Sequence, residues 1–365
     1  MRFVDEFRDP AIALRLVEQI KAASTKRWVL MEVCGGQTHS LLRHGIDQEL
    51  QDAVELIHGP GCPVCVTDTR AIDLALWLAS QPQTVLASFG DMLRVPGSSG
   101  SLLTTRAAGG QVMTVYSPLD AVSHASKHPN KQVVFFAVGF ETTAPATALA
   151  VLQAQKLGLS NFFLLVSHVR VLPAMEALMQ SPDNRVQAFL AAGHVCCVTG
   201  YAAYDEFAKR YRVPVVVTGF EPVDLLQGIL ECVTQLESGR AEVSNSYGRS
   251  VERDGNRDAQ RIIDTVYQID DRPWRGFGIV DAGGYRLRDG FAAFDAECRF
   301  GDLIGQITTS KDSRCRAGDV LSGRLKPCDC PEFGGNCAPD SPLGAPMVSS
   351  EGACAAYFRY QPHAV

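Results

Sequence analysis

The sequence lacks the features that mark membrane, secreted and nucleic-acid-binding proteins. Its 365 residues carry 34 basic and 40 acidic side chains, a formal net charge of −6, so it offers no positive footprint for nucleic acid or an anionic membrane. No apolar run approaches the roughly 18 residues that a membrane-spanning helix needs. The first ten residues, MRFVDEFRDP, have no apolar core and do not predict a secretory signal. We therefore expect a cytoplasmic protein without nucleic-acid or membrane partners.

A phosphate-binding loop of the G-x-x-x-x-G-K-[ST] type is also missing, so any ATP hydrolysis would need an unconventional site. The composition is otherwise that of a globular protein, with 46% hydrophobic and 20% charged residues, which argues against long disorder. At roughly 100–200 residues per domain, the length predicts two or three domains.

Cysteine, by contrast, is abundant, with 12 residues in a chain expected to reside in a reducing compartment. Cys34, Cys62 and Cys65 lie in glycine-rich segments near the start, and five more crowd the end of the sequence. Isolated cysteines are often small buried hydrophobic residues, and we expect Cys196, Cys197, Cys232 and Cys298 to be of that kind. The two clusters instead indicate metal or redox chemistry.

Short apolar runs alternate with helical periodicity over the first 230 or so residues, a pattern typical of a parallel sheet covered on both faces. The predicted strands are Trp28–Val33, Val54–Ile57, Thr84–Ser88, Val112–Tyr116, Val133–Val138, Phe162–Val166, Val195–Val198 and Val213–Thr218. The predicted helices are Thr69–Ser80, Ala144–Leu157, Ala174–Gln180 and Asp224–Leu236.

The fold class is therefore α/β, with two parallel-sheet lobes, residues 1–120 and 121–245, around a cleft, and a C-terminal domain, residues 246–365. After Asn245 glycines and arginines multiply, and no helix is recognisable. Residues 310–355 are rich in cysteine, proline and glycine and poor in large apolar residues. Because such a segment cannot build a core of its own, we expect a bound metal to hold it together.

Polar loops follow the predicted strands, where ligand sites of open α/β sheets form. One strand ends at Cys34-Gly35-Gly36, whose position at a helix start favours the thiolate, with His39 near enough in sequence to be a proton partner. The next ends at Cys62-Pro63-Val64-Cys65, a spacing suited to a disulfide or to a soft metal. A third ends at Glu141-Thr142-Thr143, where the carboxylate could serve the site or only favour a helix dipole. His168 and His194 lie in similar loops, with packing an equal alternative.

The tail has the spacing C-x14-C-x6-C-x16-C through Cys315, Cys330, Cys337 and Cys354, with Cys328 as a fifth thiol. Four thiolates suit zinc or an iron–sulfur cluster. Zinc ribbons usually contain paired C-x2-C knuckles, and the tail has none, so the pattern favours iron–sulfur.

The ordered set of motifs resembles the HypD family, the scaffold proteins that help to build the Fe(CN)2CO unit of nickel–iron hydrogenases. The motifs are CGGQTHS, GPGCPVC, GFETTAP, GFEPVDLLQGI, WRGFG, FDAE, DCPEFGGNCAP and PLGAPMVSSEGACAAY, and together they span nearly the whole chain. The resemblance implies two α/β lobes with a C-terminal domain that holds a 4Fe-4S cluster. It also implies two partners, a HypC-type small chaperone and a HypE-type cyanide donor.

Carried over residue by residue, the resemblance makes Cys34 the thiol that binds the iron of the Fe(CN)2CO unit, and Cys62 and Cys65 a redox-active pair. Its cluster ligands are Cys315, Cys330, Cys337 and Cys354, and its cleft residues are His39, Glu141, Thr142 and Thr143. The chain departs from the family pattern around His194, where Ala192 replaces a proline and a serine expected after Gly193-His194 is replaced, giving Val195-Cys196-Cys197. The role of that loop therefore stays open.

The alternative is a thiol–disulfide oxidoreductase with a structural zinc in its tail. Thioredoxin-like enzymes usually have near 100 residues and a single C-x-x-C, so the length and the tail thiols count against it.

Overall fold

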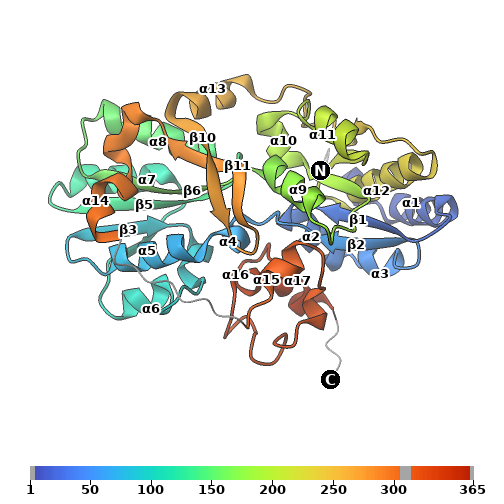
Figure 1. Cartoon of the computed structure of the whole chain (residues 1–365), viewed down its shortest axis with the longest axis horizontal. Coiled ribbons are helices and arrows are strands. Elements are labelled where there is room, and N and C mark those ends of the chain that lie inside the picture. Colours follow the sequence, from blue (N-terminus) through green and yellow to red (C-terminus); the bar gives the residue numbers. More distant parts are fainter. Residues whose placement is uncertain (1–4, 305–313, 362–365) are drawn as a thin grey trace.

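The computed structural model describes residues 5–304 and 314–361, without the side chains of 302–304. Two α/β units lie side by side along the long axis, and the cysteine-rich tail sits beneath their junction (Figure 1). Within the described residues, the sheets have the strand orders β2-β1-β7-β8-β9 and β4-β3-β5-β6, both parallel, and a β10-β11 hairpin is antiparallel. The predicted α/β class with parallel sheets is confirmed.

The first sheet has apolar side chains on both faces, because helices cover both. Helices α1 and α12 pack on one face, and α9, α10 and α11 pack on the other. Its strands are β1 (Trp28–Glu32), β2 (Val54–His58), β7 (Ala188–Ala192), β8 (Val215–Thr218) and β9 (Val243–Asn245). The helices of this unit are α1 (Pro10–Ala23), α2 (Gly35–Arg43), α3 (Ile46–Glu49), α9 (Val171–Gln180), α10 (Gly193–Thr199), α11 (Tyr204–Tyr211) and α12 (Pro222–Glu237).

The second sheet is likewise buried between helical layers, with α7, α8 and α13 on one face and α5, α6 and α14 on the other. Its strands are β3 (Thr84–Ser88), β4 (Val112–Thr114), β5 (Gln132–Gly139) and β6 (Phe162–His168). The helices around it are α5 (Thr69–Ala79), α6 (Leu102–Ala107), α7 (Pro118–Lys127), α8 (Ala144–Lys156), α13 (Arg257–Val266) and α14 (Ala296–Ile304).

The hairpin β10 (Tyr267–Trp274) and β11 (Gly278–Leu287) crosses the junction between the units (Figure 1). The tail contains only short elements within its described residues, so little of it can form a core. They are α15 (Ala317–Leu321), a 3-10 turn η4 (Pro327–Asp329), α16 (Ala345–Val348) and α17 (Ala353–Tyr360). Among the described helices, none combines the length and apolarity needed to cross a bilayer.

The sheets do not divide at residue 120, the predicted lobe boundary. Strands β1 and β2 join β7, β8 and β9, so the chain leaves the first unit after α4 (Pro63–Val66) and returns to it after β6. Residues of α13 and of the hairpin pack on the second unit, although the prediction assigned them to a C-terminal domain. Periodicity identifies strands but does not say which strands pair, and the lobe boundaries depended on pairing.

Two further differences have local causes. The predicted strand Val195–Val198 is wrong, because those residues belong to α10 and the strand is Ala188–Ala192, which pairs with β1 and β8. A short apolar run fits either a strand or a buried helix, and periodicity does not separate them. The prediction that helices end after Asn245 is also wrong: α13 begins where the Asn256 side chain accepts the backbone N–H groups of Asp258 and Ala259.

Candidate functional site

Cys34 lies where β1 ends and α2 begins, as the sequence predicted, and only 2% of its surface is exposed. Glycines allow this packing. A β-carbon on Gly61 would lie 2.1 Å from the Cys34 nitrogen, and one on Gly35 would lie 2.3 Å from the Glu351 carbonyl oxygen. The glycines therefore let both the C-x-x-C loop and the tail contact the Cys34 segment.

Cys62 and Cys65 form a disulfide at the start of α4, with their Cα atoms 5.2 Å apart, and both are buried. The N–H of Gly35 donates to the carbonyl of Gly61 at 3.1 Å, so the loop before the disulfide is hydrogen-bonded to the start of α2. Because β1 and β2 are parallel neighbours, the cysteine loops that follow them meet at one edge of the first sheet.

His194, the second residue of α10, directs its Nδ1 at the sulfur of Cys34, 3.5 Å away. Burial lowers the pKa of His194 to about 4, so its ring is neutral at pH 7. Burial also raises the pKa of Cys34 above its usual range, although the N–H groups of Gln37 and Gly36 act to lower it. The expectation that the helix start favours the Cys34 thiolate is therefore wrong here, because burial raises the pKa of Cys34 more than the helix-start N–H groups lower it. Cys34 is a buried thiol beside a neutral imidazole.

A buried hydrogen-bond chain joins the backbone of Cys34 to the tail. The Glu32 carboxylate accepts the Cys34 N–H at 2.9 Å and also the hydroxyl proton of Thr38. The Oε1 of Glu32 that accepts from Thr38 also lies 2.7 Å from Nδ1 of His58, whose Nε2 is 3.0 Å from the Tyr357 hydroxyl in α17. The sequence analysis missed this chain. The only sign of the chain in the sequence is a polar residue at the C-terminal end of each of two apolar runs, Glu32 in the first and His58 after the second.

Glu141 follows β5 and is 5% exposed. Its Oε1 accepts the Val171 N–H at 3.1 Å, whereas Oε2 has no hydrogen-bond partner within the described residues. Burial raises the pKa of Glu141 to about 7. Burial also raises the pKa of Cys196 and of Tyr204, and the Glu141 charge acts in the same direction on both. Cys196 is two residues beyond His194 in α10, so this helix connects the surroundings of the Glu141 carboxyl with the Cys34 thiol.

His39 and Thr143, both predicted to line the cleft, have partners of other kinds. His39 Nε2 lies 3.0 Å from the hydroxyl of Tyr360, so this histidine contacts α17 of the tail. The Thr143 hydroxyl is 3.2 Å from the Phe140 carbonyl oxygen and 3.3 Å from Nε2 of His168. Thr142 is half-buried between β5 and α8. The structure thus joins Cys34 with Cys62 and Cys65, and it places His39 against the tail.

The raised pKa of Glu141 predicts a pH-dependent stability. Its ordinary pKa is 4.5 and its value in the folded chain is about 7, so folding favours the protonated form. The favourable contribution is complete below pH 4.5 and is lost as the pH rises towards 7, by about 3 kcal/mol. Glu141→Gln stays neutral and should lack this loss. We expect the free energy of unfolding, measured by urea titration at pH 5 and pH 8, to fall more in the unmodified protein than in the variant. Equal falls would contradict the assignment.

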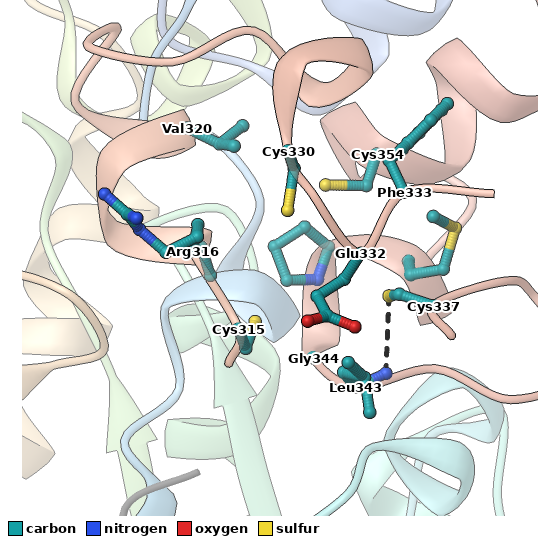
Figure 2. Close-up of a pocket in the computed structure, with 13 residues that line it drawn as sticks. Cys315, Arg316, Val320, Cys330, Glu332, Phe333, Cys337, Leu343, Gly344 and Cys354 are labelled. Carbon is teal, nitrogen blue, oxygen red and sulfur yellow. Dashed lines mark hydrogen bonds between the residues drawn. The ribbon is translucent and has the colours of Figure 1, made fainter. Parts of the chain in front are cut away.

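The predicted tail ligands line one cavity, and their sulfur atoms point into it (Figure 2). They are Cys315, Cys330, Cys337 and Cys354. The Cys337 sulfur accepts the N–H of Leu343 at 3.4 Å, the kind of contact that stabilises a thiolate ligand. Within the described residues no three His, Cys, Asp or Glu side chains converge as a single ion would require. Four cysteine sulfur atoms around one cavity have the number and softness of the ligands that an iron–sulfur cluster takes.

The remaining cysteines lie apart from this cavity's lining. Cys328, the fifth tail thiol, is exposed. Cys196 and Cys232 are buried, as predicted, whereas Cys197 is half-buried. Cys298 is exposed, so its prediction as a packing residue is wrong; cysteine is apolar enough for either place, and its local sequence does not distinguish them.

Comparison with known proteins gives one consistent result. A family model labelled HypD and described as "Hydrogenase formation hypA family" matches residues 11–361. The chain is 46% identical over 372 residues to "Hydrogenase maturation factor HypD" of Rhodobacter capsulatus, covering 99% of this chain and 98% of the relative. It is 44% identical over 369 residues to the protein of the same name from Escherichia coli K12, covering 99% and 98%. Its counterpart in Azotobacter vinelandii is 46% identical over 369 residues, covering 99% and 97%.

Proposed function

This chain belongs to the HypD family of hydrogenase maturation factors, and from that membership we propose that it is a scaffold on which the Fe(CN)2CO unit is assembled. The observation that carries the proposal is the junction of three thiol sites in one place. The backbone of Gly35, next to Cys34, contacts Gly61 of the disulfide loop on one side and Glu351 of the tail on the other.

Cys34 is the residue that would hold the iron, which is the cargo of the protein. A soft thiolate suits iron that carries strong-field ligands. Metal binding requires the thiol to lose its proton, and Nδ1 of His194, 3.5 Å away, would accept it in the tautomer that carries its own proton on Nε2. Burial keeps the thiol protonated until a cation arrives, which protects it from oxidation in the unloaded protein.

The tail thiols would hold a 4Fe-4S cluster, whose chemistry is to store and pass single electrons. Helix α16 packs against α4, so the wall of the tail cavity contacts the helix that carries the disulfide. Reduction of Cys62–Cys65 takes up two electrons and two protons and yields two thiols. The chain's own part in this step is to keep the disulfide dry and adjacent to both Cys34 and the tail.

We propose two protein partners. A HypC-type small chaperone would supply a second thiol for the iron, and a HypE-type protein would supply the cyanide. Because Cys34 is 2% exposed, loading requires the loops around it to part, and docking of the chaperone is the event that we expect to open them.

The disulfide favours one alternative, a thiol–disulfide oxidoreductase whose tail binds structural zinc. Colour separates the two functions. Protein purified without oxygen should be brown with broad absorbance near 400 nm if the tail holds a cluster, and colourless if it holds zinc.

Infrared spectroscopy tests the proposed function directly. The protein should be purified without oxygen together with its small chaperone from cells that make nickel–iron hydrogenase. We expect cyanide and carbonyl stretching bands from the complex. Iron-loaded complex without these bands would contradict a scaffold role.

A further inference from the structure

Arg275 occupies an unusual place between the disulfide helix and the tail. It lies at the tip of the β10-β11 hairpin, where its backbone N–H donates to the Val66 carbonyl at 2.8 Å. Its Nε donates to the Thr67 carbonyl at 3.0 Å. Val66 is the last residue of α4 and directly follows Cys65, so the hairpin tip is fixed to the disulfide helix.

The same tip is fixed to the tail on its other side. A β-carbon on Gly276 would lie 2.4 Å from the Gly318 Cα, and one on Gly318 would lie 2.8 Å from the Gly276 Cα. Only two glycines can approach this closely. Gly318 is in the first turn of α15, three residues after Cys315, so Arg275 lies beside a wall of the thiol cavity.

The guanidinium of Arg275 is incompletely satisfied. Its Nη2 is buried and has no hydrogen-bond partner within the described residues. Burial lowers the pKa of Arg275, and Cys315 followed by Asp68 acts in the opposite direction. A half-buried arginine with a buried, unpaired Nη2 therefore lies near a site that we expect to be anionic.

We propose that the positive charge of Arg275 compensates the negative charge of the tail cluster and thereby raises the reduction potential of the cluster. The inference rests on the cluster assignment made under the proposed function. A one-electron reduction of the cluster adds one negative charge, with no proton taken up and no bond broken. A nearby cation stabilises that extra charge, and solvent screens the attraction less where the Nη2 of Arg275 is buried.

The test is a redox titration of the full-length protein with dithionite as electron donor, followed by electron paramagnetic resonance. Arg275→Gln should lower the equilibrium constant for reduction on the order of tenfold, which is about 59 mV for a one-electron couple. Arg275→Lys keeps the charge and should stay within about twofold of the unmodified protein. Arg324→Gln is the matched control, since Arg324 is a more exposed tail arginine whose Nη2 pairs with Asp319 at 2.9 Å. Its equilibrium constant for reduction should also stay within about twofold of that of the unmodified protein.

The outcomes separate charge from structure. An unchanged potential in Arg275→Gln overturns the inference, as does an equal shift in the Gln and Lys variants. If the Gln variant loses its iron while the Lys variant keeps it, the charge is still what the site requires. If both lose it, the role is structural and the inference fails. Iron and colour in the unmodified protein test the cluster itself, so failure of the proposed function is recognised separately.

Discussion

Replacing Cys34 with alanine should abolish the infrared bands of the Fe(CN)2CO unit while leaving the fold and the tail iron intact. The expected loss is complete, because the neighbouring sulfur atoms, those of Cys62 and Cys65, are held in a disulfide and offer no thiolate to the cargo iron. Removing one buried sulfur should lower the free energy of unfolding by only about 1 kcal/mol, since the cavity created is small. Infrared spectra of the chaperone complex, with iron content per chain, are the measurements.

Cys232→Ala is the matched control for this variant. Cys232 is as buried as Cys34 and lies in the same α/β unit, and its sulfur contacts only the Phe189 carbonyl among its described hydrogen-bond partners, at 3.8 Å. Its replacement creates a similar cavity and should leave the bands at full intensity. Bands that persist in Cys34→Ala would mean that the iron is held elsewhere, with Cys62 and Cys65 the next candidates. Cys34→Ser is a weaker test, because a hydroxyl can still coordinate iron poorly.

The sequence was a reliable guide to features that depend on local pattern. β3 has the predicted bounds, Thr84–Ser88, and most other strands agree within about two residues. The same pattern placed Cys34 at a strand end and the C-x-x-C pair at the next one, because the carboxyl ends of parallel strands share an edge. Strand bounds and strand ends follow from the two-residue period of strands and the 3.6-residue period of helices, and each period can be recognised within about a dozen residues.

What depends on contacts between distant segments was not predictable in this way. His194 is 160 positions from Cys34, and the contact exists because β7 pairs with β1 in the middle of the sheet. His58 and Tyr357 are separated by 299 positions and meet only because the tail folds back onto α2. The raised pKa of Cys34 was not predictable for the same reason, since the burial that raises it comes from loops that no local pattern brings together.

The second large effect is expected in the tail. Cys354→Ser should remove the cluster iron and make the chain beyond about residue 314 sensitive to limited proteolysis, while both α/β units stay resistant. The reason is that the tail has little core of its own. The buried cluster centred on it contains only Ala356 and Tyr357 of the tail, with Leu42 of α2, and other buried tail side chains such as Leu321 and Val348 join the cores of the two α/β units. That is too little to offset the entropy of ordering so many residues without a bound group.

Cys328→Ser provides the comparison, because it removes a tail thiol that is exposed and does not line the cavity. Its side chain approaches Asp329, with sulfur and Oδ1 3.9 Å apart, and a serine hydroxyl can occupy the same place. The variant should therefore keep its iron, its colour and its resistance to protease. If Cys328→Ser bleaches the protein while Cys354→Ser does not, the ligand set is wrong. If the tail of Cys354→Ser resists protease without iron, its short helices fold by packing on α2 and α4 alone.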